Sequence, residues 1–324
     1  MDICLNNDVL SRVSTGLERY RLIHCALPEI SLDDIKLSSS FLGKKLSYPI
    51  YISPITGGNN EAKRINRNLA AAAERYNIPI CMGSMRAALE KEELKESFSV
   101  RKYAPNAMIF ANMGAVQLNY GYSEKECNKL VRMIGADALV LHLNPLQEAI
   151  QPEGDTDFSG LLPKIKRIAS GIDVPLIIKE VGHGISGAVC EALESAGISC
   201  IDVAGIGGTS WAAVEGFRSK NSLGERFRNW GNPTAECIIE ARERTGLPLI
   251  ASGGIRDGID IVKALCLGAN LCGIALPLLR PANESGECVE KYLDTLIKEI
   301  RIAMFCIGAR DIKDLGRDKI TLKL

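Results

Sequence analysis

Short apolar runs alternate with amphipathic segments along most of this 324-residue chain, and no other feature restricts its fold as strongly. Their shortness and their many branched side chains are typical of buried β-strands. Eight of them occur, at residues 50–55, 79–82, 108–112, 138–143, 175–179, 200–203, 249–252 and 271–275. Helical patterns lie between them at residues 62–76, 123–134, 159–170, 186–196, 234–244 and 257–267. Strands and helices in this order form a parallel sheet, so an α/β protein is predicted.

Eight strand–helix repeats are the number that closes a (β/α)8 TIM barrel. We therefore predict a single-domain barrel, with a doubly wound open sheet as the alternative. Residues 1–45 precede the first strand and are expected to form an N-terminal extension that packs on the barrel of residues 46–324. Residues 204–231 form a long insertion after the sixth strand, and a loop of that length is usually functional or disordered.

The overall composition excludes several classes of protein. The chain has 39 basic and 39 acidic residues, so its net charge suggests neither a nucleic-acid nor a membrane partner. Its eleven cysteines include no C-x-x-C pair, which indicates reduced thiols rather than a disulfide framework. The N-terminus has no signal-peptide pattern, and no apolar run reaches the roughly 18 residues of a membrane span. A cytoplasmic protein is expected.

Polar or glycine-rich residues follow nearly every predicted strand. The C-terminal ends of barrel strands are where α/β barrels keep their chemistry. These ends are residues 56–58, 83–86, 112–114, 142–148, 179–182, 204–209, 252–256 and 275–276. Buried polar groups cost stability unless they form hydrogen bonds. Because polar residues follow so many strands and converge on one end of the barrel, a large polar ligand is implied.

The seventh and eighth strand ends indicate an anionic part of that ligand. S-G-G-I-R at residues 252–256 opens the predicted helix 257–267, where glycine N–H groups and the helix N-terminus can hold a phosphate. A tight strand-to-helix turn is the plainer interpretation of this motif. Lys179, however, would bring a charge into the barrel mouth, which is costly unless an anionic or electron-rich group meets it. Flavin mononucleotide (FMN) fits, with its phosphate at strands 7 and 8 and Lys179 near the electron-accepting end of the ring.

The motifs of this chain resemble, in order and spacing, those of the type 2 isopentenyl diphosphate isomerases. H-x-N-x-x-Q-E at residues 142–148, followed by P-E-G-D at residues 152–155, is the most distinctive part of a match that runs from about Leu22 to Leu315. The resemblance implies a homotetrameric or homo-octameric barrel enzyme that uses FMN and Mg²⁺. Its reaction is the interconversion of isopentenyl and dimethylallyl diphosphate, with NADPH as the reductant of the flavin.

The resemblance also implies roles for individual residues. Gln147 is the catalytic residue at the reacting carbons, and Glu148 holds the Mg²⁺ that neutralises the diphosphate. The substrate-binding residues are Ser84, Arg86, His142, Asn144 and Gln147. The FMN-binding residues are Ile55, Thr56, Gly57, Ser84, Asn112, Lys179, Thr209, Gly254, Ile255, Arg256, Ala275 and Leu276.

The chemistry explains why a flavin is needed. Moving a double bond by one carbon requires one proton added and another removed, without net oxidation. Ordinary side chains are weak acids for an unactivated alkene, whereas reduced flavin offers an N5 proton and an electron-rich ring. The predicted reaction is thus a 1,3-allylic proton shift in which reduced flavin is the acid and base and the protein positions the partners.

Departures from the family pattern leave alternatives open. The family's N-terminal R-K-x-x-H segment is not matched, and the first basic residue is Arg12. The usual S-Q-R becomes S-M-R at Met85, and the usual G-F-G becomes G-H-G at His183. Either Arg86 and Mg²⁺ suffice for the diphosphate, or the start lies upstream of Met1, or the substrate has changed.

Two other functions are therefore weighed. One is a diverged FMN-binding relative with an altered substrate or without isomerase activity. The other is an FMN-dependent oxidoreductase of the 2-hydroxy-acid oxidase kind, which is similar in its flavin phosphate turn. That family has a catalytic His before the paired glycines after the sixth strand, where this chain has Ile206.

Several polar residues near the motifs are interpreted as structural or solvated. Asp155 and Asp157 are expected in a solvated acidic loop. Arg226 and Arg228 lie in a stretch that reads as polar loop, so they are expected to be surface charges. Trp211 is expected to pack within the insertion rather than to meet the ligand.

Overall fold

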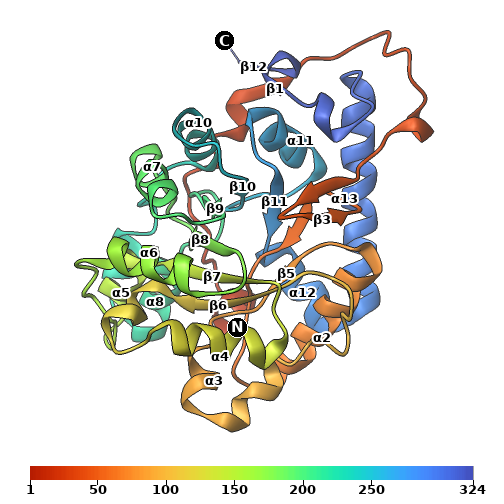
Figure 1. Cartoon of the computed structure of the whole chain (residues 1–324). Coiled ribbons are helices and arrows are strands. Elements are labelled where there is room, and N and C mark those ends of the chain that lie inside the picture. Colours follow the sequence, from red (N-terminus) through yellow and green to blue (C-terminus); the bar gives the residue numbers. More distant parts are fainter. Residues whose placement is uncertain (324) are drawn as a thin grey trace.

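Eight parallel strands close into a barrel in the computed structural model, which describes residues 1–323 (Figure 1). Strand β11 pairs with β4, with Cys272 opposite Ile50, and this pairing closes the barrel. The barrel strands are β4 (Ile50–Ile52), β5 (Ile80–Cys81), β6 (Ile109–Gly114), β7 (Ala138–Leu143), β8 (Leu176–Glu180), β9 (Cys200–Asp202), β10 (Leu249–Ala251) and β11 (Leu271–Ile274). Each predicted run overlaps one of them. The barrel prediction is confirmed, and the open-sheet alternative is wrong.

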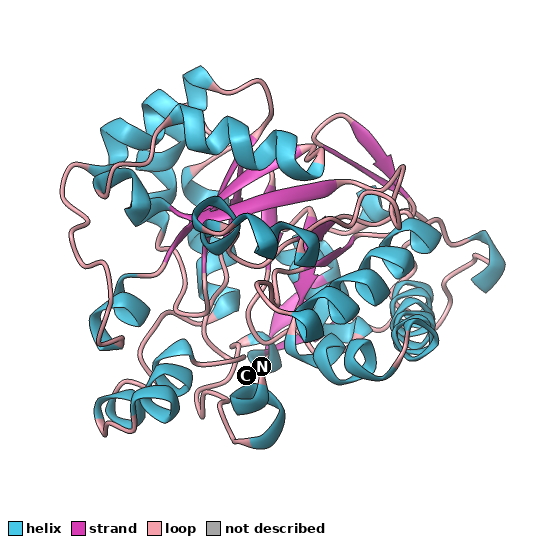
Figure 2. Cartoon of the chain, turned by 90° about the horizontal axis from the view of Figure 1, so that it is seen from below, coloured by secondary structure: helices cyan, strands magenta, loops and turns pink. Residues whose placement is uncertain are grey.

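Helices surround the barrel, as Figure 2 shows from below. Helix α4 illustrates how the sequence sets their bounds. It begins after a capping box formed by Ser123 and Glu126 and ends at Gly135, whose φ of 59° is left-handed. The helices are α2 (Asn60–Tyr76), α3 (Arg86–Glu90), α4 (Glu124–Ile134), α5 (Pro145–Ile150), α6 (Leu161–Gly171), α7 (Gly187–Ser195), α8 (Trp211–Ser219), α9 (Leu223–Arg226), α10 (Thr234–Arg244), α11 (Gly258–Leu267), α12 (Leu276–Glu284) and α13 (Gly286–Cys306).

The barrel interior is filled with side chains, so the barrel is not a pore. Tyr51 and Phe110 lie inside it with ring centroids 5.7 Å apart. The hairpin of β2 (Ser39–Phe41) and β3 (Lys44–Leu46) adds Phe41 to the same apolar cluster. Because this cluster closes the N-terminal end of the barrel, a ligand can enter only from the C-terminal ends of the strands.

The two ends of the chain lie side by side. Strand β1 (Tyr20–Leu22) pairs antiparallel with β12 (Ile320–Leu322), with Tyr20 opposite Leu322. Helix α1 (Asp2–Asn6) lies against α8 and α12, at the opposite end of the barrel from this pair (Figure 1). The N-terminal segment therefore runs along the barrel from its open end to its closed end.

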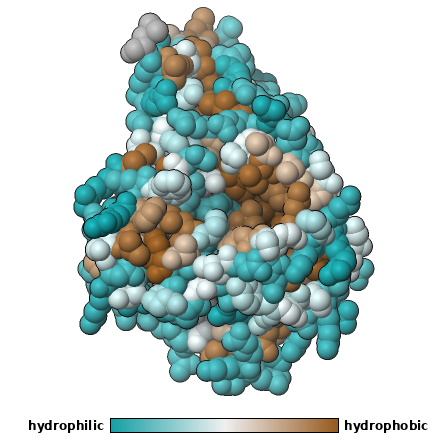
Figure 3. All heavy atoms as spheres, turned by 90° about the vertical axis from the view of Figure 1, so that its left-hand side faces the viewer, coloured by the Kyte–Doolittle hydropathy of each residue, from teal (hydrophilic) through white to brown (hydrophobic). Residues whose placement is uncertain are grey.

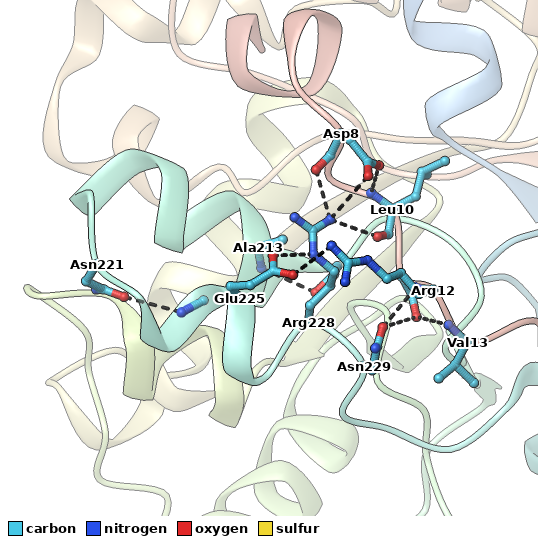
Figure 4. A network of polar contacts seen from close by, with 12 residues as sticks. Asp8, Leu10, Arg12, Val13, Ala213, Asn221, Glu225, Arg228 and Asn229 are labelled. Atoms are coloured by element: carbon cyan, nitrogen blue, oxygen red, sulfur yellow. Dashed lines mark hydrogen bonds and ion pairs between the residues drawn. The ribbon is translucent and has the colours of Figure 1, made fainter.

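The insertion after β9 is folded, and a buried arginine joins it to the N-terminal segment (Figure 4). Arg228 is only 5% exposed. Its Nη1 donates to the carbonyls of Asp8 (2.8 Å) and Leu10 (3.0 Å), and its Nε pairs with Glu225 (2.6 Å). The prediction that Arg228 is a surface charge is therefore wrong, because its partners are carbonyls about 220 residues away in sequence. Arg226 is exposed.

None of the helices within residues 1–323 has the length and apolar character needed to cross a membrane. One face of the molecule has apolar areas separated by polar side chains (Figure 3). The exposed large apolar side chains include Phe217, Leu223 and Trp230 of the insertion. These scattered side chains do not by themselves identify a partner.

Candidate active site

One cavity of about 580 Å³ lies at the C-terminal ends of the barrel strands. All eight strand–helix connections contribute to its wall, together with α1. Every residue that the sequence analysis assigned to substrate, flavin or metal lines it, namely Ile55, Thr56, Gly57, Ser84, Arg86, Asn112, His142, Asn144, Gln147, Glu148, Lys179, Thr209, Gly254, Ile255, Arg256, Ala275 and Leu276. The structure thus brings these residues together, and their contacts indicate what each can do.

The turns after β9 and β10 touch each other backbone to backbone. A Cβ on Gly208 would lie 2.6 Å from the nitrogen of Gly254. Gly253 has a φ of +93°, and a Cβ there would lie 2.0 Å from the carbonyl oxygen of Gly205. Only glycine fits such positions. The two turns therefore offer a wall of backbone groups without side chains, which suits close approach to a phosphate.

Two helices begin beside these turns, α11 and α12. Helix α11 is capped by its own Asp257, whose carboxylate accepts the N–H of Asp260 (2.8 Å), and that negative charge opposes a second anion there. Helix α12 begins after Ala275 without a side-chain cap, and Ala275, Leu276 and Pro277 all line the cavity. The N–H groups at the start of α12 are thus not occupied by a side-chain cap, and they add partial positive charge to this side of the cavity.

Lys179 has a buried counter-charge beneath the cavity. It is 5% exposed and lies opposite Asp202 in the register of β8 and β9. The Asp202 carboxylate accepts the hydroxyl of Ser252 at 2.6 Å. Burial raises the pKa of this carboxyl, whereas Lys179 and Ser252 oppose the rise. The Lys179 ammonium donates to the carbonyl of Glu180, and Asp202 adds a nearby negative charge without a direct ion pair.

Glu180 shapes the loop that follows Lys179. Its Oε2 accepts the backbone N–H groups of Val181 (2.6 Å), Gly182 (2.7 Å) and Gly184 (3.2 Å). His183, which replaces the usual family residue, is buried with Nδ1 3.4 Å from Glu180 Oε1. The first two residues of the K-E-V-G motif therefore differ in role: Lys179 faces the cavity, and Glu180 holds the loop.

His142 is held as a neutral imidazole. Its Nδ1 lies 2.9 Å from the side-chain oxygen of Asn112, whose amide nitrogen donates to the carbonyl of Met82 (3.0 Å). That oxygen can only accept, so Nδ1 carries the proton and Nε2 is an acceptor. Burial and, to a smaller extent, the charges of Lys179 and Arg86 together lower the pKa of His142 to about 3.

Glu148 is a buried carboxylate that faces the cavity. It is 8% exposed, its Oε1 accepts from Asn144 Nδ2 (2.7 Å) and its Oε2 accepts the N–H of Asp155 (2.8 Å). The side-chain oxygen of Asn144 is buried without a partner within the described chain, so it can serve a ligand. Residues 1–323 contain no cluster of three His, Cys, Asp or Glu able to hold a metal. Any metal here would need substrate and water ligands, which Mg²⁺ tolerates.

Asp155 is an anchor for Arg86 rather than part of a solvated loop. Its Oδ2 lies 2.9 Å from Arg86 Nη1 and also accepts from Gln117 Nε2 at 2.9 Å. The expectation for Asp155 is therefore wrong, because its partners come from turns far away in sequence. Asp157 is exposed, and its carboxylate accepts the N–H of Ser159 at 3.0 Å.

Besides Val214, helix α8 of the insertion adds Trp211, Glu215 and Arg218 to the cavity wall, residues to which no site role was assigned from the sequence. Trp211 thus borders the cavity, and its expected lack of contact with the ligand stays a prediction. Glu215 Oε1 accepts from Gln147 Nε2 (3.0 Å), and Glu215 Oε2 accepts from Arg218 Nε (2.6 Å). Their spacing of four and then three residues is one helical face. That spacing would have identified them if the insertion had been recognised as helical.

The family of the chain follows from comparison with known proteins. The family model described as FMN-dependent dehydrogenase matches residues 5–141 and 148–322. A flavocytochrome b2 mutant with pyruvate bound has a TM-score of 0.70 at 21% identity, covering 96% of this chain and 78% of that one. A soluble mutant of the membrane-associated (S)-mandelate dehydrogenase from Pseudomonas putida has a TM-score of 0.70 at 18% identity, covering 98% and 93%. The chain belongs to the FMN-dependent dehydrogenase family.

Closer relatives define the branch within this family. Isopentenyl-diphosphate delta-isomerase from Nostoc sp. is 52% identical, over 97% of this chain and 91% of that protein. The proteins of the same name from Pyrococcus furiosus and Oceanobacillus iheyensis are both 48% identical, over 97% of this chain and 83% and 91% of theirs. The chain is therefore a member of the type 2 isopentenyl-diphosphate delta-isomerases.

Proposed function

We propose that the protein interconverts isopentenyl diphosphate and dimethylallyl diphosphate by a 1,3-allylic proton shift, using FMN and Mg²⁺ with NADPH as the flavin reductant. The observation that carries this proposal is the convergence of two kinds of group on one cavity. Lys179 and the glycine turns suit a flavin, and Arg86 and Glu148 suit a metal-bound diphosphate. Reduced FMN, when bound, would supply an N5 proton and an electron-rich ring beside the alkene.

On the flavin side, the residues bind and orient. The backbone of Gly254 and Ile255, the side chain of Arg256 and the N-terminus of α12 would receive the phosphate. Lys179 would lie at the electron-accepting end of the ring, where its ammonium is held by the carbonyl of Glu180. A fixed cation there stabilises negative charge on the ring without reorganisation during the reaction.

On the diphosphate side, charge is neutralised by a metal and an arginine. Glu148 would contribute one carboxylate ligand to Mg²⁺, with substrate phosphates and water as the others. Arg86 would make charge-assisted hydrogen bonds to the same diphosphate, from a position fixed by Asp155. His142 is neutral, so its Nε2 can accept a hydrogen bond without adding a charge.

Gln147 would orient the reacting carbons, because its amide is held from two sides. Its Nε2 donates to Glu215 at 3.0 Å, and its Oε1 lies 3.4 Å from Asn144 Nδ2. An amide does not exchange protons at neutral pH, so its contribution is position rather than acid strength. Trp211, Val214 and Leu279 line the same cavity with apolar surface suited to a hydrocarbon chain.

The remaining features are proposed on the same basis. We infer a cytoplasmic homo-oligomer, a tetramer or octamer, in which residues 1–45 pack on the barrel of residues 46–324. The pairing of β1 with β12 and the contacts of Arg228 with Asp8 and Leu10 support that arrangement of the N-terminal segment. Size-exclusion chromatography with light scattering would measure the assembly.

An anaerobic assay tests the proposal. The FMN-loaded protein is reduced, supplied with Mg²⁺ and isopentenyl diphosphate, and the products are followed by NMR. Dimethylallyl diphosphate should form only with reduced flavin and a divalent cation. A protein that holds FMN but forms no product would favour a diverged relative. The oxidoreductase alternative lacks support at residue 206, where a buried isoleucine precedes Gly207 and cannot act as a base.

A further inference from the structure

Arg218 is a further cation on the cavity wall, besides Arg86, Lys179 and Arg256. It comes from α8 in the insertion, whereas Arg86 comes from α3 after β5. Its guanidinium is held by two carboxylates, with Nε 2.6 Å from Glu215 Oε2 and Nη2 2.5 Å from Glu153 Oε1. The two arginines therefore reach one cavity from different parts of the barrel.

The two carboxylates that hold Arg218 differ in burial. Glu215 is 5% exposed and also accepts from Gln147, so it is fixed within the site. Glu153 is 56% exposed at the rim and pairs with Arg218 there. Solvent screens an exposed pair of this kind, so an anion of higher charge can replace its carboxylate. The contact of Arg218 with Glu215 is therefore fixed, whereas its contact with Glu153 can be replaced by an anion.

A single short loop supplies a carboxylate to each arginine. Glu153 pairs with Arg218, and Asp155 pairs with Arg86 at 2.9 Å. Gly154 between them packs on the site, because a Cβ there would lie 1.9 Å from the carbonyl oxygen of Glu148. The pKa of Glu153 is lowered mainly by its hydrogen bond to Arg218, and the charge of Arg86 adds to this. The charges of both arginines are thus felt at the loop of residues 153–155.

We propose that Arg218 is a phosphate-binding residue of this site, and that Glu153 is an exchangeable counter-ion which occupies Arg218 until a diphosphate displaces it. This inference rests on the proposed function. Arg86 and the metal at Glu148 hold one end of the anion, and Arg218 receives the other. A diphosphate offers one phosphate to each group of contacts, whereas a monophosphate offers only one phosphate in all. Arg218 is therefore a residue that selects diphosphate over monophosphate.

Binding of inorganic anions to the FMN-loaded full-length protein tests this assignment. Calorimetry with Mg²⁺ compares inorganic pyrophosphate with inorganic phosphate. Arg218→Gln should weaken pyrophosphate binding about tenfold or more and leave phosphate binding within about twofold, as one charge-assisted contact is lost. Glu153→Gln should strengthen pyrophosphate binding several-fold, because the competing carboxylate is gone. This second variant changes an exposed side chain and is not expected to disturb folding.

Arg226→Gln is the matched control, since Arg226 is an exposed arginine of α9 in the same insertion. It should bind both anions as the unmodified protein does, and all variants should retain FMN. Unchanged pyrophosphate affinity in Arg218→Gln, or weaker affinity in Glu153→Gln, would overturn the inference.

The inference and the proposed function can fail separately. Arg218-dependent pyrophosphate binding in a protein that forms no dimethylallyl diphosphate would defeat the proposed function. Normal isomerisation with an unchanged KM for isopentenyl diphosphate in Arg218→Gln would defeat the inference and leave the proposed function intact.

Discussion

The two sides of the cavity are built from different materials. The side proposed for the flavin is mostly backbone, with Gly208 and Gly254 in close contact and α12 beginning after Ala275 without a side-chain cap. The side proposed for the diphosphate is mostly charged side chains, and Glu148, Arg86 and Arg218 each have carboxylate or amide partners there. A side chain added to a closely packed backbone wall would collide with its neighbours. On a wall of charged side chains, a substitution that removes a charge should weaken binding more than one that changes only shape. Variants on the two sides should therefore fail in different assays.

The largest effect is expected from Gly254→Ala on the flavin side. Gly254 has a φ of +78°, and a Cβ there would lie 2.4 Å from Thr15 Cγ2 and 2.5 Å from the carbonyl carbon of Gly207. Strain and overpacking each cost about 1–3 kcal/mol, so FMN affinity should fall about a hundredfold. Fluorescence titration with FMN measures this. Gly286→Ala is the control, because a Cβ there has no atom within 4 Å, and it should bind FMN normally. If both variants lose the same FMN affinity, close packing at Gly254 is not the cause.

Arg86→Ala tests the diphosphate side. Loss of about 1.5–3 kcal/mol of charge-assisted binding should raise the KM for isopentenyl diphosphate by one to two decades, while FMN affinity stays the same. Steady-state kinetics and FMN titration on one preparation measure both. Arg167→Gln, which removes an exposed arginine paired with Glu124, is the control. A parallel loss of FMN binding in Arg86→Ala would contradict the division of the cavity into two sides.

Glu148→Gln should raise the Mg²⁺ requirement about tenfold, because an amide replaces the carboxylate that faces the metal. Asn144 Nδ2 and the Asp155 N–H donate to different oxygens of Glu148, and the amide retains one of them, so one of the two hydrogen bonds is kept and thermal unfolding is measured on the same preparation. The dependence of rate on Mg²⁺ concentration gives the measurement. If the variant and the unmodified protein have the same Mg²⁺ dependence, Glu148 does not hold the metal.

The smallest expected effect concerns stability in acid. The pKa of His142 is about 3 in the folded protein, below the usual value of 6.5. As pH falls from 6.5 towards 3, the unfolded chain takes up a proton that the folded chain does not, so stability is lost. Between pH 7 and pH 5 this loss is at most about 2 kcal/mol. Urea unfolding at both pH values should show a smaller loss in His142→Asn, and identical losses would contradict the buried neutral imidazole.

Features with a local cause could be predicted from the sequence. The strands follow from apolar runs such as residues 138–143, and α4 follows from its capping residues. The glycine turns follow from the motifs around Gly207 and Gly253, because a backbone conformation depends on neighbouring residues.

Features made by contacts between distant segments could not be predicted in the same way. Arg228 is buried because two carbonyls of the N-terminal segment accept its N–H groups. Asp155 and Glu153 meet their arginines only after the barrel has closed. The position of a side chain in such a network depends on the fold as a whole, and a single sequence without its fold does not specify it.

The reductant balance tests the central claim most directly. The protein is incubated anaerobically with FMN, Mg²⁺, a limiting amount of NADPH and excess isopentenyl diphosphate, and NADPH loss and dimethylallyl diphosphate formation are measured together. An isomerase on this site should form many equivalents of product for each NADPH oxidised, because the flavin is reduced once and then reused. One NADPH oxidised for each substrate converted would show net reduction, and would contradict the isomerase account.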